Sequence, residues 1–284
     1  MGKHIFVILQ YIIPQHFISK LIGKLANSKN PRLKNFLISN FLKFYEINMQ
    51  EALEQDISKF DSFNSFFIRR LNPRKRPICK KEQSIVCPVD GEISQIGSIE
   101  KNKVFQAKGR TFDLFKFLGG DENLCEEFQN GSFSTIYLSP KDYHRVHIPF
   151  TGTLRTMCYI PGKLFSVNHA TVDSVNNLFD KNERLITIFD TTYGPMAIIL
   201  VGAMIVSGIH AVWYEKDFKG QRKIKIFKYP RSGAKSVTLQ KGEELGHFEL
   251  GSTVVICFPD GKMKWKKQLE GGSDVQMGQM LGTF

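Results

Sequence analysis

The sequence predicts an α+β protein in which N-terminal amphipathic helices are followed by an antiparallel β-sandwich or a barrel-like core. Apolar residues recur at helical spacing before residue 45, whereas short β-branched and aromatic segments dominate after residue 83. The 284 residues are 42% hydrophobic and 12% aromatic, which is ample for a core and argues against disorder. We divide the chain into a helical region, residues 1–62, and a β-rich domain, residues 63–284.

Two sets of apolar residues predict amphipathic helices near the N-terminus. They recur at helical spacing with lysines on the other faces, and they are Phe17, Leu21 and Leu25, then Leu33, Leu37, Phe41 and Phe44. The apolar run 5–13 is interrupted by Gln10 and stopped by Pro14, well short of the roughly 20 residues that span a bilayer. No small-residue cleavage site follows it, so a signal peptide is disfavoured.

Charge is distributed unevenly along this chain, whose formal net charge is +12. The first acidic residue is Glu46, and the lysines and arginines before it lie among isoleucine, leucine and phenylalanine. We interpret the N-terminal helices as lying in the interface of an anionic leaflet, where each basic residue contributes on the order of 1 kcal/mol. Helices that only cover the core are the alternative interpretation.

A second basic cluster follows the aromatic pair Phe66-Phe67, and it consists of Arg69, Arg70, Arg74, Lys75, Arg76, Lys80 and Lys81. Two prolines within it suit a linker into the β region, so a solvated linker and a role facing a phosphate or a lipid headgroup both stay open. Basic patches beside aromatic residues also bind nucleic acid, but no RRM, KH, helix-turn-helix or zinc-finger pattern accompanies this one. We therefore expect no nucleic-acid partner.

Ten short segments between Gly, Pro, Asp and Asn residues predict strands. They are residues 93–99, 104–107, 133–138, 154–160, 185–190, 196–201, 205–209, 223–229, 237–239 and 253–258. A helix is predicted at residues 122–129. The five cysteines are odd in number, widely spaced and without a CxxC pair, which favours neither a disulfide framework nor a zinc ribbon and fits a reducing compartment.

The segment Leu250-Gly251-Ser252-Thr253 places a serine where a tight turn enters an apolar strand. Because glycine lacks a Cβ, the Gly251 carbonyl can be approached closely and its backbone can be strained at low cost. Both properties suit an N-to-O acyl shift of Gly251 onto the Ser252 hydroxyl. A Gly-Ser turn without chemistry is the alternative for the tripeptide taken alone.

Two other segments supply the groups that a reactive serine needs. A hydroxyl attacks only after a base takes its proton, and a histidine base works best beside a carboxylate. Asp90 lies in a Pro-Val-Asp-Gly turn between two predicted strands, and His144 and His147 lie three residues apart. In an extended strand these histidines would point to opposite faces, so a turn or bulge is required if both line one pocket. The alternative for either histidine is an ordinary strand or loop position.

At these residues the chain resembles the phosphatidylserine decarboxylases that carry a self-made pyruvoyl group. The resemblance covers about residues 45–284 and rests on five blocks in the family's order: residues 63–71, 88–91, 143–147, 165–168 with 182–184, and 250–253. The Leu-Gly-Ser-Thr form is similar to the bacterial and mitochondrial type. One departure is Ser207-Gly208-Ile209-His210, where the family is expected to show a glycine before the small polar residue and no histidine. Any role of His210 therefore stays open.

The resemblance implies an enzyme that decarboxylates phosphatidylserine to phosphatidylethanolamine. Its inactive precursor would cleave itself between Gly251 and Ser252 into residues 1–251 and 252–284, which stay together as a heterodimer. Further association into a homo-oligomer is left open. Ser252 would become the pyruvoyl cofactor, and no metal ion is implied. By this resemblance His144 is the proton donor in decarboxylation, and His147 with Asp90 is the base pair for self-cleavage.

The implied partners are phosphatidylserine as substrate and an anionic membrane surface. The implied location is that of a peripheral membrane protein on the cytoplasmic face of the inner cell membrane. In this interpretation residues 1–62 associate with the membrane and residues 63–284 form the catalytic domain.

Two other classes of protein stay open at this point. A zinc hydrolase would use His144, His147 and Asp90 as ligands and leave a fourth position open. A nonenzymatic membrane-binding or carrier module is suggested by the Pro-Val-Asp-Gly turn, which is similar to turns of biotinyl and lipoyl domains. However, no Met-Lys-Met-type hairpin carries an attachable lysine, because residues 262–264 read Lys-Met-Lys. Both alternatives leave the Leu-Gly-Ser-Thr segment unexplained.

Overall fold

The computed structural model describes residues 2–206, 208–218 and 220–284, apart from the side chains of residues 2–4. Ser207, part of the departure from the family pattern, therefore lies outside the described residues. The two helices predicted before residue 45 are confirmed as α2 (Gln15–Ala26) and α3 (Pro31–Tyr45), and the apolar run before Pro14 forms a third helix, α1 (Gly2–Ile12). Shorter helices follow: α4 (Phe63–Phe67), α5 (Leu114–Phe117), α6 (Glu122–Phe128), α7 (His169–Val172) and α8 (Leu178–Lys181).

Strands make up most of the chain after residue 83. They are β1 (Ser84–Val86), β2 (Gly91–Ser98), β3 (Lys103–Ala107), β4 (Arg110–Asp113), β5 (Ser132–Leu138), β6 (Arg145–His147), β7 (Gly152–Ile160), β8 (Arg184–Thr191), β9 (Gly194–Val201), β10 (Gly208–Ala211), β11 (Lys225–Lys228), β12 (Thr238–Leu239), β13 (Glu244–Glu249), β14 (Ser252–Phe258), β15 (Lys264–Trp265), β16 (Asp274–Val275) and β17 (Met280–Thr283).

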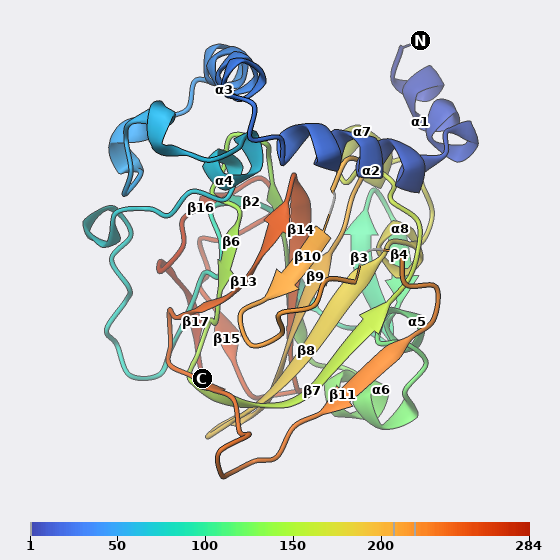
Figure 1. The fold of residues 1–284 in the computed structure, drawn as a ribbon. Coiled ribbons are helices and arrows are strands. Elements are labelled where there is room, and N and C mark those ends of the chain that lie inside the picture. The colour runs from blue at the N-terminus through green and yellow to red at the C-terminus, as the bar shows by residue number, and fades with distance from the viewer. Residues whose placement is uncertain (1, 207, 219) are drawn as a thin grey trace.

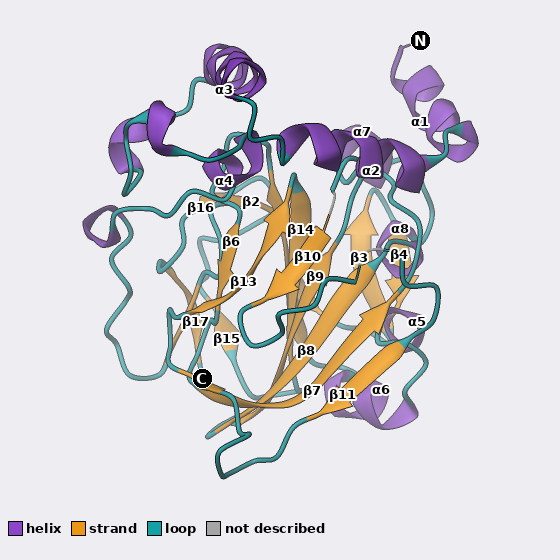
Figure 2. Ribbon diagram, viewed as in Figure 1, coloured by secondary structure: helices purple, strands orange, loops and turns teal. Residues whose placement is uncertain are grey.

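A nine-stranded antiparallel sheet forms the centre of the molecule (Figure 1). Its order is β11-β7-β8-β9-β14-β5-β2-β16, with β12 beside β7. Two three-stranded sheets, β10-β13-β6 and β1-β17-β15, and the hairpin β3–β4 complete the β-structure. Figure 2 shows the helices gathered around the edges of these strands. The predicted α+β class is confirmed, and no sheet closes into a barrel within the residues described.

Both faces of the large sheet are buried at its centre. Along β14, Val255 and Cys257 belong to one apolar cluster, whereas Val254, Ile256 and Phe258 belong to a second. Successive side chains of a strand point to opposite faces, so a strand buried on both faces has a continuous apolar run rather than an alternating one. This burial explains the apolar run in β14.

A different layer covers each face. The second cluster also contains Val146 of β6 and Phe248 of β13, so the small sheet β10-β13-β6 packs on that face as in a sandwich. The first cluster includes the hairpin β3–β4 and the short helices α5 to α8. On that side the ring of Phe112 lies 4.8 Å from Phe117 and 5.4 Å from Phe179.

Most predicted strands are confirmed, but the one predicted at residues 205–209 is displaced toward the C-terminus and overlaps the observed strand only at residues 208–209. β10 begins at Gly208, and Ile205 has a φ of 67°, which interrupts an extended strand. The sequence does not predict β6 and β13, because histidine, arginine, glycine and glutamate dilute their apolar pattern. Their antiparallel pairing with each other makes both of them strands. The helix predicted at residues 122–129 is confirmed as α6.

Two buried glutamines hold the first two helices on the core. Gln10 donates from Nε2 to Thr171 Oγ1 at 3.1 Å and accepts from Ser166 N at 2.8 Å. Gln15 donates to Gln10 O and accepts from Leu164 N, both at 2.7 Å. Gln10, which interrupts the apolar run in the sequence, is therefore an anchor to the core.

The first two helices meet at a sharp bend. The segments 5–12 and 15–26 are inclined by 93°, and only as a pair do they reach the length and apolarity of a membrane span. No single helix in the described part of the chain is long and apolar enough to cross a membrane. Helices α1 to α4 lie together at one end of the β-structure (Figure 1).

We predict that Gly91→Ala destabilises the fold, because its Cβ would lie 2.2 Å from the backbone oxygen of Tyr137 on β5. The strands β2 and β5 would have to separate, which should lower the free energy of unfolding by about 1–3 kcal/mol. Gly97→Ala is the matched control, since its Cβ on the same strand meets nothing within 4 Å. Denaturant titration measures both variants, and equal midpoints would contradict the prediction.

Candidate functional site

Ser252 is the first residue of β14, where the turn from β13 enters the large sheet, as the sequence predicts. It pairs with Leu138 of β5, and its side chain is fully buried. Its Oγ has no hydrogen-bond partner in the part of the chain that the structure describes. Buried hydroxyls are nearly always hydrogen-bonded, so an unpaired one requires an explanation such as strain or catalysis.

The two residues before Ser252 both have a left-handed backbone. The φ angle is 73° at Leu250 and 58° at Gly251. A Cβ at Gly251 would meet nothing within 4 Å, so glycine is needed there for its φ and not for space. Leucine in this conformation costs about 1–2 kcal/mol. The backbone is thus strained on the N-terminal side of Ser252, and the sequence predicts this for Gly251 but not for Leu250.

The Ser252 side chain faces the layer that contains β6 and β13. It points to the same side of β14 as Val254, and its cross-strand partner Leu138 belongs to the same second cluster. That cluster joins the large sheet to β6 and β13. Within this layer Phe248 N donates to His144 O at 3.1 Å, so His144 lies in the layer that Ser252 faces.

His144 lies just before β6 and is fully buried. Its Nδ1 is 2.9 Å from Asp142 O, so Nδ1 carries the proton and Nε2 presents a lone pair. Among the described residues, Nε2 has no partner. Burial, with help from the charge of Arg69 and against the Asp142 hydrogen bond, lowers the pKa of His144 to about 3. The imidazole is therefore neutral near pH 7 with one free basic nitrogen.

A closed turn fixes this tautomer. Asp142 accepts from Ser139 N through Oδ2 at 2.7 Å and donates from its own N to Ser139 O at 3.0 Å. Pro140 occupies the second position of this turn, where its fixed φ is favourable. The turn directs the Asp142 carbonyl toward His144 Nδ1.

Helix α4 and the residues after it form the wall behind His144. The Phe67 ring lies 4.1 Å from the His144 imidazole, between centroids. Arg145 of β6 donates to Ile68 O at 2.8 Å and pairs with Glu244 of β13 at 2.5 Å. The block at residues 63–71 thus surrounds His144, a role that its sequence alone does not reveal.

His147 is the last residue of β6, and both of its ring nitrogens are engaged. Nδ1 is 2.8 Å from Gly242 O, and Nε2 is 2.9 Å from the Tyr143 hydroxyl. A carbonyl can only accept, so Nδ1 is protonated and Tyr143 donates to Nε2. Burial lowers the pKa of His147. The Tyr143 hydroxyl therefore has to turn away before Nε2 can take another proton.

The two histidines occupy different local structures. His144 precedes β6 whereas His147 ends it, and the register of β13 against β6 shifts between Glu244 and Gly246. The extra residue of this bulge lies in β13, so within their own segment the histidines are separated by the closed turn before His144, and a single pocket lined by both stays a prediction.

Asp90 lies in the turn between β1 and β2 and is held by Arg76. Arg76 Nε is 2.9 Å from both carboxylate oxygens, and Nη2 is 2.6 Å from Oδ2. Met277 N donates to Oδ1 at 2.8 Å, and Arg76 also pairs with Glu51 at 2.7 Å. Asp90 thus acts on His147 through its charge, which favours the protonated imidazole.

Asp90, Asp142 and Tyr143 line one cavity of about 150 Å³ together with Arg69 and Arg76. Among the described residues, no three His, Cys, Asp or Glu side chains lie close enough together to hold a metal ion. The zinc-hydrolase interpretation therefore lacks a ligand set.

His210 lies on β10, which pairs with β13. Its Nε2 is 3.2 Å from Glu249, and its ring stacks on His247 with centroids 4.8 Å apart. These contacts stabilise the pairing of the strands that lead to Ser252.

Residues 165–168 and 182–184 are joined by hydrogen bonds, which close the loop between them. Asn182 accepts from Phe165 N at 3.1 Å and donates to Phe165 O and Gly202 O at 2.9 Å. Arg184 donates to the backbone carbonyls of Lys116, Phe117, Asp180 and Asn182. Burial lowers the pKa of Arg184 to about 10. These side chains stabilise the fold beside the site.

A buried serine behind a strained backbone, facing the layer that holds a buried neutral histidine, is an arrangement expected of an enzyme that processes its own chain. A family model described as phosphatidylserine decarboxylase matches residues 63–283, and a second, described as PSD, matches residues 5–46. The chain belongs to the phosphatidylserine decarboxylase family.

Curated relatives agree with this assignment over nearly their whole length. Proteins named phosphatidylserine decarboxylase proenzyme from Pseudomonas entomophila and Pseudomonas putida are each 47% identical over 283 residues, which is 100% of this chain and 99% of theirs. The protein of the same name from Alcanivorax borkumensis is 51% identical over 281 residues, 99% of this chain and 96% of its own. The predicted family is confirmed, and neither alternative class gains support.

Proposed function

We propose that this protein decarboxylates phosphatidylserine to phosphatidylethanolamine by means of a pyruvoyl group that it forms from its own Ser252. The observation that carries the proposal is the fully buried Ser252 hydroxyl, which lacks a partner among the described residues and follows two left-handed residues. Family membership and the word proenzyme in the names of the relatives support it.

Self-cleavage would begin with attack of Ser252 Oγ on the carbonyl carbon of Gly251. The Oγ–C bond forms, the bond from Gly251 C to Ser252 N breaks, and the hydroxyl proton reaches the departing nitrogen by way of a base. Breaking this bond lets Leu250 and Gly251 leave the left-handed region, so stored strain favours the reaction. Because Ser252 is buried, water is kept from competing for the acyl group.

We assign the base for this step to His147, assisted by Asp90. The Gly242 carbonyl holds His147 Nδ1, and Nε2 becomes available when the Tyr143 hydroxyl turns away. The Asp90 carboxylate, fixed by Arg76, stabilises the imidazolium through its charge.

A pyruvoyl group at residue 252 supplies an electron-accepting ketone for the amine of the serine headgroup. The residues around position 252 fit such a group, because His144 Nε2 is buried and has no partner among the described residues. We assign to His144 Nε2 the transfer of one proton to the substrate carbon after carbon dioxide leaves. Because Nε2 presents a lone pair, it first takes a proton, which the headgroup ammonium supplies when its nitrogen reacts with the ketone; its lowered pKa then favours passing that proton to the substrate carbon.

The two products of cleavage would stay together as one heterodimer. Strand β14 lies between β9 and β5, β16 pairs with β2, and β17 pairs with β1. The side chains from Val254 to Phe258 are fully buried. At about 25 cal/mol per Å² of apolar surface, their exposure would make separation of residues 252–284 costly.

The N-terminal helices would hold the enzyme on an anionic membrane as a peripheral protein. Large apolar side chains are exposed on α1 and α2, and they are Ile5, Phe6, Ile8, Leu9, Tyr11, Ile12, Phe17, Leu21 and Leu25. An exposed apolar surface of this kind, flanked by lysines, is typical of interfacial helices. Anionic lipid and free thiols both favour the cytoplasmic face of the inner cell membrane.

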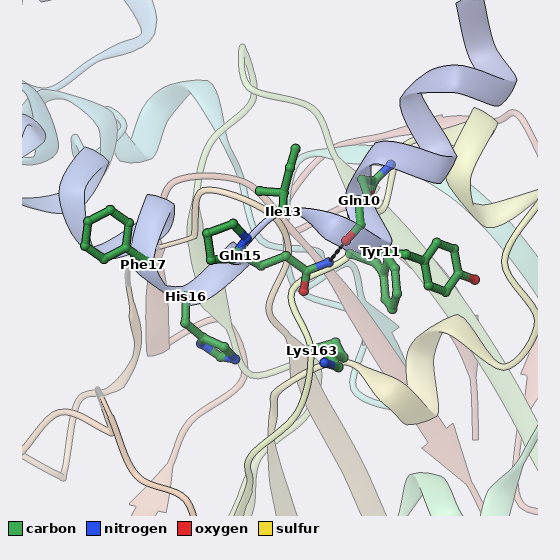
Figure 3. A pocket seen from close by; sticks show the side chains of 9 residues that line it. Gln10, Tyr11, Ile13, Gln15, His16, Phe17 and Lys163 are labelled. Atoms are coloured by element: carbon green, nitrogen blue, oxygen red, sulfur yellow. Dashed lines mark hydrogen bonds between the residues drawn. The ribbon is translucent and has the colours of Figure 1, made fainter.

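A cavity of about 300 Å³ lies at the bend between α1 and α2 (Figure 3). Tyr11, Phe17 and Lys163 line it, and His16 Nε2 lies 2.8 Å from Gly162 O beside it. On a membrane this cavity would lie at headgroup level, with Lys163 facing lipid phosphates. This arrangement supports a division in which residues 1–62 meet the membrane and residues 63–284 carry out the chemistry.

We predict that Ser252→Ala gives a folded, membrane-binding chain of 284 residues that is uncleaved and inactive. The hydroxyl that would receive the Gly251 acyl group is gone, while the loss of an unpaired hydroxyl should change stability by less than about 1 kcal/mol. Denaturing electrophoresis, intact mass and carbon dioxide release measure the outcome.

Ser134→Ala is the matched control for this variant. Ser134 is also fully buried in the large sheet, and its Oγ likewise has no partner among the described residues. It should be cleaved and active. Activity in Ser252→Ala, or activity of an uncleaved wild-type chain, would refute the pyruvoyl mechanism.

We predict that the two histidines separate cleavage from decarboxylation. His144→Ala should cleave but decarboxylate at least about 100-fold more slowly, since it lacks the proton donor. His147→Ala and Asp90→Asn should remain largely single chains. Intact mass reports cleavage and carbon dioxide release reports activity; an uncleaved His144→Ala with a normally processed His147→Ala would reverse the assignment.

We predict that Ile12→Glu combined with Phe17→Glu weakens binding to phosphatidylserine vesicles by at least about tenfold, because charge replaces apolar contact with the lipid. Ile12 is 75% and Phe17 68% exposed, so the fold should tolerate both changes. Ile226→Glu, at a 60% exposed position on β11, is the matched control. Vesicle sedimentation measures binding, and equal binding by the double variant and the control would refute the proposed surface.

A further inference from the structure

Arg69 is a buried cation with unmet hydrogen-bond donors. It is 5% exposed, and within the described part of the chain its Nε and Nη1 atoms have no partner. Its Nη2 reaches Lys141 O at 3.3 Å, and its guanidinium lies 5.4 Å from the centre of the Phe66 ring. A buried charge is costly unless it is paired, so this side chain requires an explanation.

Two other buried arginines show how this fold satisfies a guanidinium. Arg76 pairs with Asp90 and Glu51, and Arg184 donates to four backbone carbonyls. Arg69 is buried to a similar degree, but it has no ion pair and donates to a single backbone carbonyl, that of Lys141 at 3.3 Å. The donors that it leaves unmet are those that a carboxylate or a phosphate accepts from.

Arg69 also lines the cavity of about 150 Å³ beside Tyr143. A space of this size holds a few water molecules or one carboxylate group. Four carboxylates also line it, and none of them pairs with Arg69: Asp90 and Glu51 pair with Arg76, half-buried Asp142 accepts from Ser139, and Glu46 is exposed. A further anion in this cavity would therefore find the Arg69 donors available.

The cleavage site borders the same aromatic wall. Leu250 is buried in one apolar cluster with Phe66 and Phe67. Arg69 lies over Phe66, and His144 lies against Phe67. The residue before Gly251 thus shares an apolar cluster with the two phenylalanines that Arg69 and His144 contact.

We propose that Arg69 binds the carboxylate that self-cleavage creates at Gly251 and so speeds the step that releases it. This assignment rests on the self-cleavage proposed above. In the precursor Gly251 ends in an amide carbonyl, which explains why Arg69 has no anion to bind there. After release, Gly251 is no longer held in the left-handed turn, and its buried carboxylate needs a cation.

The chemistry of release creates the negative charge that Arg69 would bind. In the ester between Gly251 and Ser252 Oγ, a histidine base removes the Cα proton of residue 252 and the Cα–Cβ double bond forms. The Cβ–Oγ bond breaks, and its electron pair leaves with the Gly251 carboxylate. Negative charge thus develops on two oxygens in the transition state, and a guanidinium with free N–H groups stabilises it in a site that excludes water. The dehydroalanine left at residue 252 then tautomerises to an imine, which water hydrolyses to the pyruvoyl group with release of ammonia.

Arg69→Met tests the proposal, because it keeps an apolar stem and removes the charge. The exposed neighbour Arg70→Met is the matched control. Newly synthesised chains are followed by intact mass with and without hydroxylamine, which cuts the ester and leaves residues 252–284 with an N-terminal serine. We expect Arg69→Met to form the pyruvoyl end at least about tenfold more slowly and to accumulate ester. Arg69→Lys should recover part of the rate.

A second measurement separates this role from a structural one. In the uncleavable Ser252→Ala chain, Arg69→Met should leave the thermal midpoint unchanged or raise it, because a buried unpaired charge is removed. A lower midpoint there would assign Arg69 to the fold and overturn the proposal.

Other outcomes also overturn it. If Arg69→Met forms the pyruvoyl end as fast as Arg70→Met and accumulates no ester, Arg69 has no role in release. Normal processing with a raised KM for phosphatidylserine would assign Arg69 to the lipid phosphodiester instead. A wild-type chain that forms no pyruvoyl end would refute the proposed function itself, and the role of Arg69 would fall with it.

Discussion

The left-handed turn between β13 and β14 is the constraint on which the rest of the structure depends. Strand β13 belongs to the small sheet with β6 and β10, whereas β14 is a central strand of the nine-stranded sheet. Only Leu250 and Gly251 join them, so the chain passes from one layer to the other within two residues whose φ angles are both positive. Hydrogen-bonded partners on both edges of both strands prevent the turn from relaxing. Strain is therefore held at the bond before Ser252.

Buried charges organise the surroundings of this turn. Arg145 pairs with Glu244 and ties β6 to β13, and Arg76 holds Asp90. Each pair offsets the desolvation of its own members, so these groups are fixed in place. Arg69 differs because its counterpart is absent from the precursor in our proposal. A carboxylate that forms in the interior of a fold is costly unless a cation is already in place. Water is excluded from such a site, so solvent cannot stabilise the new charge.

The N-terminal helices α1 and α2 are joined to the β-rich part of the chain by hydrogen bonds as well as by packing. Gln10 accepts a hydrogen bond from Ser166 N, and Gln15 accepts one from Leu164 N. In the same loop, Asn182 accepts a hydrogen bond from Phe165 N. The outer faces of α1 and α2 can therefore contact lipid while their inner faces fix a loop of the catalytic domain. In our proposal, this coupling fixes the lipid-binding faces of α1 and α2 relative to the β-rich part of the chain.

Local properties of the sequence predict most of the N-terminal helices, the apolar strands and the reactive residue types. These properties are the helical period, the apolar runs, and the Gly-Ser, Asp and His motifs. Strand β13 and the partners of the charged groups were decided only by tertiary structure. Asp90 meets Arg76 and Met277, and His147 meets Gly242, across long separations in sequence. The basic cluster at residues 69–81 likewise divides into buried Arg69 and Arg76 and exposed neighbours. Hydrogen bonds and Coulomb interactions depend on distance in space, and distance in space follows from how the layers pack.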